Sequence, residues 1–265
     1  MFINELVAVT LDEYINEPTG LDSFNEAKYI SDHLDRYRFT LSDIIDLTKD
    51  HFSNSARILD ISSYSGFVPV ALSRAGYNVT VTDVPAVMQC AGLITKLNKF
   101  SIDYASSELH NELPFDDNSF DLISCCETLE HLNFNPIIAL KHIYRVLKPG
   151  GILYLTVPSA SQLRNLILLT QGKQDDSFVE LFSSKQADGA FPIQSIGVHW
   201  HEYTSQEITR ILGSAGFKSI RVSFRNNLGN YPAFKRVAIS FIIRCFPHFS
   251  STMALTALKE VNDEI

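Results

Sequence analysis

The sequence contains no run of basic residues. Its 265 residues include 22 lysines and arginines against 30 aspartates and glutamates, which gives a formal net charge of −8 at pH 7. Proteins that bind nucleic acids present clustered basic side chains to the phosphate backbone. We therefore predict no nucleic-acid partner or substrate, and the acidic balance better suits a small neutral or cationic ligand.

Cysteine is scarce and shows no metal-binding spacing. The four cysteines are Cys90, Cys125, Cys126 and Cys245, and no two of them form a Cys-x-x-Cys pair. This spacing argues against a zinc site built on cysteine. Cys125 and Cys126 stand in an apolar stretch typical of a buried strand, so we interpret the cysteines as reduced core thiols of a cytoplasmic protein.

Long apolar segments are also missing. The apolar runs at residues 166–169 and 237–243 are far shorter than the roughly 20 residues that cross a bilayer as a helix. The first residues carry acids and no basic segment, unlike a secretory signal peptide. We expect no signal peptide, no membrane span and a cytoplasmic location.

Two common catalytic fingerprints are absent. Positions 62, 64 and 67 are serine, tyrosine and phenylalanine, so the Gly-x-Gly-x-x-Gly pattern of nicotinamide-dependent dehydrogenases is not present. The Gly-x-Ser-x-Gly elbow of α/β hydrolases does not occur either. These absences argue against both enzyme classes.

A strand–turn–helix–strand unit organises the chain. Ile58–Ile61 is a short apolar run typical of a strand buried on both faces, and Ser62–Gly66 supplies a tight turn. A helix begins at Phe67, and a second strand at Val79–Thr82 ends in Asp83. An acid at a strand end can accept hydrogen bonds from ribose hydroxyls, and a helix N-terminus attracts anions. The pattern predicts half of a nucleotide-binding fold.

Predicted helices and strands alternate along the rest of the chain. Residues 204–207, Thr-Ser-Gln-Glu, form a capping box at the start of one helix. The alternation predicts an α/β fold with a doubly wound, mostly parallel sheet, an antiparallel edge strand and helices on both faces. Helices are predicted at residues 23–49, 86–99, 133–147, 204–215 and 252–261, and further strands at residues 101–104, 120–125, 152–157, 218–224 and 236–243.

Several segments resemble the signatures of class I S-adenosylmethionine (SAM) methyltransferases. Ile58–Ile61, Ser65 and Gly66 resemble motif I, although Ser62 and Tyr64 stand where that family usually has glycine. Three further segments are similar to the family's Leu-Pro-Phe-x-Asp-x-Ser-Phe-Asp, Glu-x-Leu-Glu-His and Leu-Lys-Pro-Gly-Gly signatures: residues 113–121, 127–131 and 147–151. The resemblance implies a Rossmann-like, seven-stranded sheet and SAM as the cofactor.

The resemblance also implies which residues surround SAM. Asp60 would line its methionine end, Asp83 would bind the ribose hydroxyls, and Val84 would lie against the adenine. The full set of cofactor-binding residues that the resemblance implies is Arg36, Tyr37, Asp60, Ser62, Gly66, Asp83, Val84, Glu108, Leu109, Cys126 and Glu127.

Histidines supply the candidate catalytic groups. Residues 199–204, His-Trp-His-Glu-Tyr-Thr, resemble a segment that faces the acceptor in many small-molecule methyltransferases. Histidine titrates near neutral pH, so His199, His201 and His131 are candidate general bases, and packing against the body of the protein is their alternative role. His199 and His201 alternate along the chain, but the sequence places no further ligand beside them, and we predict no metal site.

The resemblance divides the chain into four parts. We predict an N-terminal helical arm or cap at residues 1–50, a SAM-binding core at 51–158, an insertion or lid at 159–203, and the last core strands with a closing helix at 204–265. It implies methylation of an oxygen of a small-molecule acceptor, with nitrogen and carbon as less favoured atoms. The alternative, motivated by the two missing glycines, is a non-catalytic relative that binds SAM or S-adenosylhomocysteine weakly or not at all. The sequence identifies neither the acceptor nor the oligomeric state.

Overall fold

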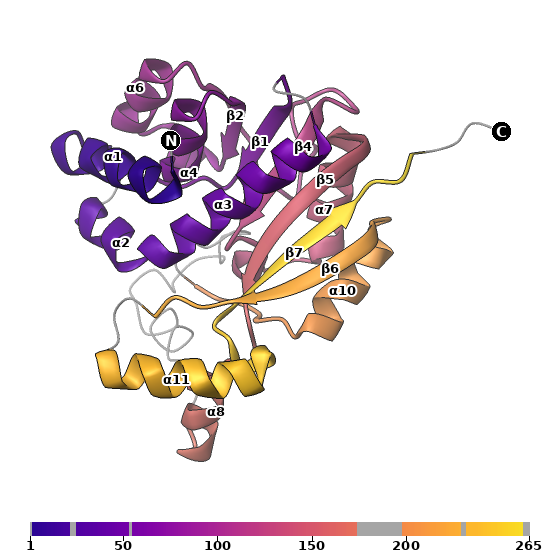
Figure 1. Cartoon of the computed structure of the whole chain (residues 1–265). Helices are drawn as coiled ribbons and strands as arrows, with labels where there is room; N and C mark the ends of the chain where they lie inside the picture. Colours follow the sequence, from indigo (N-terminus) through magenta and orange to yellow (C-terminus); the bar gives the residue numbers. More distant parts are fainter. Residues whose placement is uncertain (1, 22–24, 53–54, 174–197, 229–231, 262–265) are drawn as a thin grey trace, which may run out of the picture.

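The chain folds around a seven-stranded sheet, seen in a computed structural model that describes residues 2–21, 25–52, 55–173, 198–228 and 232–261 (Figure 1). The strands are β1 (Arg57–Ile61), β2 (Asn78–Asp83), β3 (Asp103–Ser106), β4 (Phe120–Cys126), β5 (Leu147–Pro158), β6 (Lys218–Arg225) and β7 (Thr252–Leu258). Their order is β3-β2-β1-β4-β5-β7-β6, and only the pairs that include β7 are antiparallel within the described residues. The predicted fold class is confirmed, and the reversed strand lies one position in from the sheet edge.

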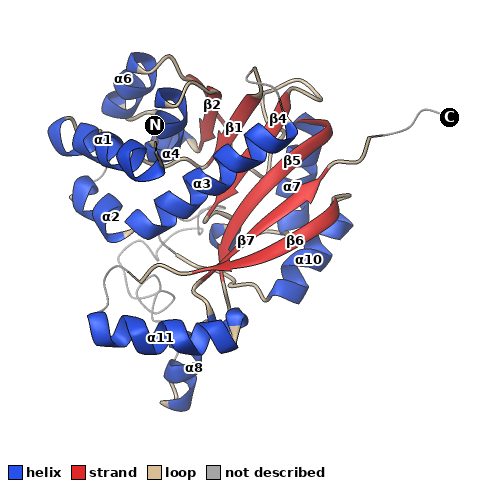
Figure 2. Cartoon of the chain, viewed as in Figure 1, coloured by secondary structure: helices blue, strands red, loops and turns tan. Residues whose placement is uncertain are grey.

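Helices cover both faces of this sheet (Figure 2). They are α1 (Ile3–Asn16), α2 (Glu26–Asp32), α3 (Leu34–His51), α4 (Phe67–Arg74), α5 (Pro85–Met88), α6 (Ala91–Lys99), α7 (Pro136–Val146), α8 (Leu163–Thr170), α10 (Ser205–Ser214) and α11 (Ala233–Cys245), with short 3-10 turns η1 (Leu129–His131) and η3 (Pro247–Phe249). Ile58 and Leu122 belong to a core with α1, α3, α4 and α6. Leu59 and Ile123, their neighbours in sequence, belong to a second core with α7 and α10. Successive side chains of β1 and β4 thus enter opposite cores, so both faces of these central strands are buried.

Side-chain caps fix several helix starts. The Asn135 side chain accepts a hydrogen bond from the Ile137 N–H at 3.0 Å and begins α7. Thr204 and Glu207 form the predicted capping box of α10. The single helix predicted over residues 86–99 is two helices, α5 and α6, separated at residues 89–90. These caps are local, so the sequence pattern predicts them well.

Two predicted elements at the end of the chain are wrong. Residues 236–243, predicted as a strand, lie in helix α11, and residues 252–261, predicted as a closing helix, contain strand β7. An apolar run usually indicates burial, but Phe234, Val237 and Phe241 on α11 are at least 70% exposed. β7 is rich in alanine and leucine, which favour helix, and it becomes a strand because it pairs with β5 and β6. Within the described part of the chain, no helix combines the length and apolar character that a membrane span requires.

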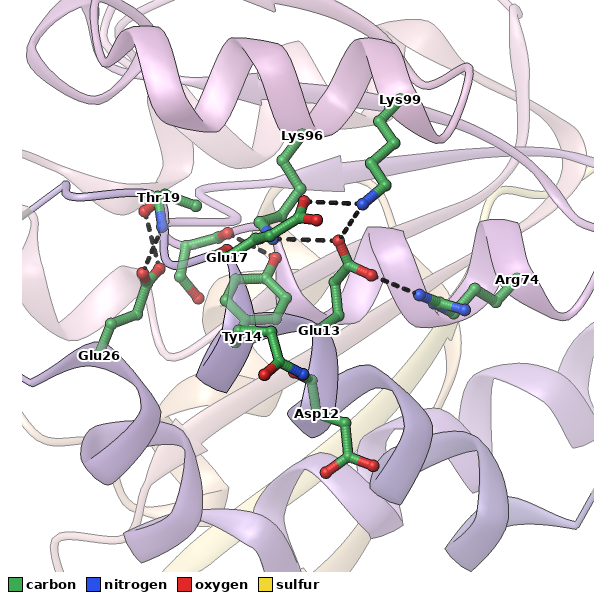
Figure 3. A network of polar contacts seen from close by, with 11 residues as sticks. Asp12, Glu13, Tyr14, Glu17, Thr19, Glu26, Arg74, Lys96 and Lys99 are labelled. Carbon is green, nitrogen blue, oxygen red and sulfur yellow. Dashed lines mark hydrogen bonds and ion pairs between the residues drawn. The ribbon is translucent and has the colours of Figure 1, made fainter.

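The N-terminal helix α1 is fixed to the core by a network of ion pairs (Figure 3). The Glu13 carboxylate accepts hydrogen bonds from Arg74 of α4 and Lys99 of α6, each at 2.8 Å. The Lys96 ammonium lies 3.5 Å from the same carboxylate, is only 4% exposed, and donates to the Glu17 carbonyl at 2.6 Å. Since three cations share Glu13, this side chain neutralises most of the buried charge between α1, α4 and α6.

We expect Glu13→Gln to lower the free energy of unfolding by about 1–3 kcal/mol, because it removes the charge that compensates buried Lys96. Urea unfolding measures the loss. Glu17→Gln is the matched control, since the Glu17 side chain is 61% exposed and pairs only with half-exposed Lys99 among the described ion pairs. Equal stability losses in the two variants would contradict the assignment of the buried charge to Glu13.

Candidate functional site

A cavity of about 710 Å³ opens where β1, β2 and β4 reach their carboxyl ends. Ligands of doubly wound sheets bind at this edge, and the volume is within the range of small-molecule sites. The cavity brings together side chains from segments that are far apart in the sequence. Its lining includes these predicted site residues: Arg36, Tyr37, Asp60, Ser62, Asp83, Cys126, Glu127, His131 and His199.

The turn after β1 has the backbone of a glycine-rich loop without all of its glycines. Ser62 has a φ of 57°, Tyr64 of 51° and Gly66 of 77°. Non-glycine residues adopt this left-handed conformation at a cost, and such strain concentrates at functional sites. The N–H of Tyr64 donates to the Asp83 carboxylate at 2.8 Å, which holds the turn against the end of β2. Ser62 and Tyr64 therefore adopt, in this turn, a backbone conformation that glycine adopts more readily.

Gly66 lies where α1 and α6 approach the turn after β1. It is outside the lining of the cavity, and a Cβ atom at this position would lie 3.1 Å from Leu93 Cδ1 and 3.5 Å from the Tyr14 hydroxyl. The Tyr14 hydroxyl also donates to the Ser65 carbonyl at 2.8 Å. A positive φ and the close approach of α1 and α6 both require glycine here, and the predicted contact of Gly66 with the cofactor stays a prediction.

We expect Gly66→Val to lower the free energy of unfolding by about 2–4 kcal/mol, since a β-branched residue fits neither the φ of 77° nor the space beside Leu93. Ser62→Gly is expected to change stability by less than about 1 kcal/mol, because relief of the positive φ offsets the entropy of glycine. Urea unfolding of both variants tests the pair. A Gly66→Val protein as stable as wild type would show that this backbone conformation is wrong.

Two buried carboxylates stand at adjacent strand ends in the cavity. Asp60 on β1 accepts a hydrogen bond from the Ser124 hydroxyl at 2.5 Å, and burial, aided by the Asp83 charge, raises the pKa of Asp60 to about 7. Asp83 accepts hydrogen bonds from the N–H groups of Tyr64 at 2.8 Å and Val84 at 2.7 Å, and burial raises the pKa of Asp83 to about 7. Neither carboxylate forms an ion pair with another described residue, so both favour a ligand that brings positive charge or hydroxyl donors.

Helix α3 supplies the aromatic and basic wall of the cavity. The Arg36 guanidinium lies 3.5 Å from Glu127 and donates to the Tyr29 hydroxyl at 3.1 Å. The Tyr37 ring packs 4.5 Å from the Phe67 ring, and burial raises the pKa of Tyr37 to about 12. Arg36 thus lines the cavity as one member of an ion pair, with Glu127 as its partner.

A cluster of Glu130, His131 and His199 lines the same cavity. The Nδ1 atom of His131 lies 2.8 Å from the Val198 carbonyl, and a carbonyl only accepts, so Nδ1 carries the proton and Nε2 has the free lone pair. Burial lowers the pKa of His131 to about 4, so its ring is neutral at pH 7. The His199 ring lies 5.0 Å from the His131 ring. The side chain of Glu130 is fully buried, and burial raises its pKa well above the usual range.

Other predicted residues lie outside the lining. Glu108 lies 3.5 Å from His110 and is 45% exposed, and Leu109 is buried in the core beside α7. The side chain of His201 is 56% exposed and lies 3.7 Å from Glu207. Val84 donates to Asp83 at the rim but is not part of the lining. The structure therefore brings His131 and His199 to the cavity and leaves His201 outside it.

The structure also corrects an expectation about Tyr203 and adds residues that the sequence did not indicate. Tyr203, expected beside the acceptor with the histidines, is 3% exposed, and its hydroxyl donates to the Leu129 carbonyl at 3.2 Å in the core. Lining residues that we did not predict are Tyr29, His33, Thr40, Ile61, Ser63, Tyr64, Val68, Val87, Thr128 and Glu130. The sequence does indicate Glu130, because this residue is the second acid of the Glu-x-Leu-Glu-His segment. The α2 residues carry no such signal.

Comparisons with known proteins agree with this geometry. A family model described as a methyltransferase domain matches residues 33–222. Two curated proteins with the name ubiquinone biosynthesis O-methyltransferase match shorter stretches: that of Xanthomonas campestris pv. campestris is 31% identical over 102 residues, 38% of this chain, and that of Xylella fastidiosa is 33% identical over 104 residues, 39% of this chain. Each match spans 42% of the length of the curated relative.

Solved structures share the fold at low sequence identity. A SAM-dependent methyltransferase from Thermotoga maritima, described as a possible histamine N-methyltransferase, is 15% identical, covers 96% of this chain and all of its own, and has a TM-score of 0.57. Phosphoethanolamine N-methyltransferase 2 of Haemonchus contortus, in complex with SAM, is 18% identical over 87% of this chain and 60% of its own, with a TM-score of 0.51. At these identities the likeness shows a common fold and does not identify the acceptor.

Proposed function

Because this chain belongs to the methyltransferase-domain family, as a SAM-dependent methyltransferase, we propose that it methylates an oxygen atom of a small-molecule acceptor. The proposal rests on one cavity that holds neutral His131 and two acids, Asp60 and Asp83, neither of which forms an ion pair with a described residue. The name O-methyltransferase of the curated relatives supports oxygen over nitrogen, across the 42% of their length that matches.

The cavity residues fit SAM, which when bound supplies a methyl group on a positively charged sulfur. Asp83, at the carboxyl end of β2, would accept hydrogen bonds from the ribose hydroxyls, and Asp60 would face the cationic amino group. Cys126 and Glu127 follow β4 and would lie near the sulfonium. We place Val84, Glu108 and Leu109, which are outside the lining, toward the adenine end. This assignment gives Asp83 hydroxyl donors and Asp60 a cation.

The acceptor is proposed to occupy the histidine end of the cavity. Its hydroxyl must lose a proton as the new oxygen–carbon bond forms, and an atom with a free lone pair must lie within reach of that proton. Nε2 of His131 has such a lone pair because Nδ1 is committed to the Val198 carbonyl. Alignment of the acceptor oxygen with the methyl carbon is the larger contribution to rate in this chemistry, so the shape of this end matters as much as the base.

The N-terminal arm and the insertion are proposed to cover the cavity. Residues 1–50 are a helical cap: α2 and α3 contribute Tyr29 and Arg36 to the lining. Residues 159–203 are proposed as a lid, supported by His199 in the lining and by the hydrogen bond from the Ala160 N–H to the Tyr203 carbonyl at 2.9 Å. Residues 174–197 of this lid lie outside the described residues.

Methyl transfer to a panel of acceptors tests the proposed function. The protein is incubated with SAM and phenols, aliphatic alcohols or amines, and each product is identified by mass as a hydrogen replaced by a methyl group. We expect hydroxyl acceptors to be methylated, with one S-adenosylhomocysteine formed per product. Asp83→Asn is the control that keeps the fold but lacks the charge at the ribose. Methylation of amines without any methylation of hydroxyls would contradict the assignment of oxygen.

A further inference from the structure

We infer that Glu130, His131 and His199 bind a divalent transition-metal cation, which coordinates the oxygen of the acceptor. One carboxylate oxygen of Glu130 and one ring nitrogen from each histidine all lie within 4.8 Å of one another. Two histidines and one carboxylate with open positions form a common metal-binding set in enzymes. The sequence did not predict this site because it paired His199 with His201, which lies outside the cavity.

The buried carboxylate of Glu130 favours a bound cation. Its side chain is fully buried, and neither of its two oxygens has a hydrogen-bond partner among the described residues. Buried carboxylates without a partner are costly and rare in native proteins. A cation bound beside Glu130 removes this cost, whereas the described part of the chain offers Glu130 only the free nitrogen of His131 as an ion-pair partner, 3.9 Å away.

The orientation of His131 and His199 also favours a bound metal ion. The Nδ1–H of His131 donates to the Val198 carbonyl at 2.8 Å, and Nδ1 of His199 lies 3.3 Å from a carboxylate oxygen of Glu202. Metal-binding histidines usually donate one ring N–H to a carbonyl or carboxylate in this way, which directs the other nitrogen at the metal. The Asn165 amide in turn donates to Glu202 at 2.5 Å, so the supporting carboxylate is itself held in place.

The ligand set favours some cations over others. Imidazole nitrogen binds Mn²⁺, Co²⁺ and Zn²⁺ better than it binds Mg²⁺ or Ca²⁺, which prefer oxygen. Three protein ligands leave at least one position open for an acceptor oxygen. Glu127 lines the same cavity and adds to its negative charge, and its buried Oε1 atom has no hydrogen-bond partner among the residues that the structure describes. We therefore expect tighter binding of Co²⁺ and Mn²⁺ than of Mg²⁺.

The role of the cation rests on the proposed function. A divalent cation lowers the pKa of a bound hydroxyl, so the acceptor loses its proton to solvent near neutral pH. The acceptor oxygen then forms the bond to the methyl carbon, the carbon–sulfur bond breaks, and its electron pair stays on the sulfur. In this scheme Nε2 of His131 coordinates the cation, so solvent takes the place of His131 as the acceptor of the proton, and His199 acts as the second histidine ligand.

Cation titration of the chelator-treated protein tests the site. The visible absorption of added Co²⁺ reports coordination, and isothermal titration with MnCl₂ gives the affinity. We expect one saturable site in the wild type and at least about ten-fold weaker binding in Glu130→Gln and His199→Ala. His201→Ala is the matched control, since His201 lies outside the cavity, and its affinity for Co²⁺ should match the wild type.

Binding of S-adenosylhomocysteine is measured on the same samples. An unchanged affinity for this ligand shows that a variant is folded, and His199→Ala covers the case in which Glu130→Gln does not fold. A wild-type protein that binds S-adenosylhomocysteine but no Co²⁺ or Mn²⁺ overturns the metal site and leaves the methyltransferase assignment intact. Equal Co²⁺ affinity in wild type and His199→Ala also overturns it. A protein that binds Co²⁺ but methylates no hydroxyl supports the metal site and contradicts the proposed function.

Discussion

The affinity for SAM is expected to fall by about 10- to 100-fold when the pH is lowered from about 8 to about 6. Asp60 and Asp83 both have a pKa raised to about 7 by burial in the free protein. Ribose hydroxyls and a cationic amino group favour the ionised carboxylates, so each proton added below pH 7 opposes binding. Isothermal titration with S-adenosylhomocysteine across this range measures the slope.

Stability should show the opposite trend in the free protein. Because both folded-state pKa values are raised above those of the unfolded chain, the folded state binds more protons between about pH 4 and about pH 7. These two acids therefore lower the free energy of unfolding as the pH rises through that window. Added ligand should raise the melting temperature more at pH 8 than at pH 6. An affinity that does not change with pH would contradict the assignment of both acids to the ligand site.

Asp83→Ala is expected to weaken SAM binding by at least about ten-fold. The substitution removes a buried carboxylate that can accept from both ribose hydroxyls. It also leaves the Tyr64 and Val84 N–H groups without their acceptor, which loosens the turn after β1. Isothermal titration gives the affinity, and circular dichroism confirms the fold.

The matched control is Asp103→Ala. Asp103 begins the neighbouring strand β3, is exposed, and is outside the cavity, so its removal should leave the affinity for SAM unchanged. Undiminished affinity in Asp83→Ala would remove Asp83 from the site. Equal losses in both variants would indicate a general effect of acidic charge rather than a contact.

The fold was predictable where local pattern and burial agree. The unit from β1 to β2 has an apolar strand, a turn and an acid at the strand end, and each feature has the predicted place in the structure. The end of the chain was not predictable in this way. β7 takes its conformation from pairing with β5 and β6, and α11 is apolar but exposed, so composition predicted the wrong element for each. Long-range pairing decides such segments, and no local pattern encodes it.

The candidate site was predictable at its strand ends and less so at its loops. Asp60 and Asp83 reach the cavity because parallel strands end at one edge of the sheet. The position of His199 beside His131 depends on contacts between segments about 70 residues apart, including the bond from His131 to Val198. The contrast between His199 in the cavity and His201 outside it follows from that packing, which the alternating sequence alone does not specify.

A crystal structure of the protein with S-adenosylhomocysteine tests directly whether Asp60 and Asp83 bind the cofactor. We expect one molecule in the cavity at the ends of β1, β2 and β4, with its ribose hydroxyls within hydrogen-bond distance of the Asp83 carboxylate and its amino group facing Asp60. A ligand bound outside this cavity, or one whose ribose contacts neither oxygen of Asp83, would contradict it.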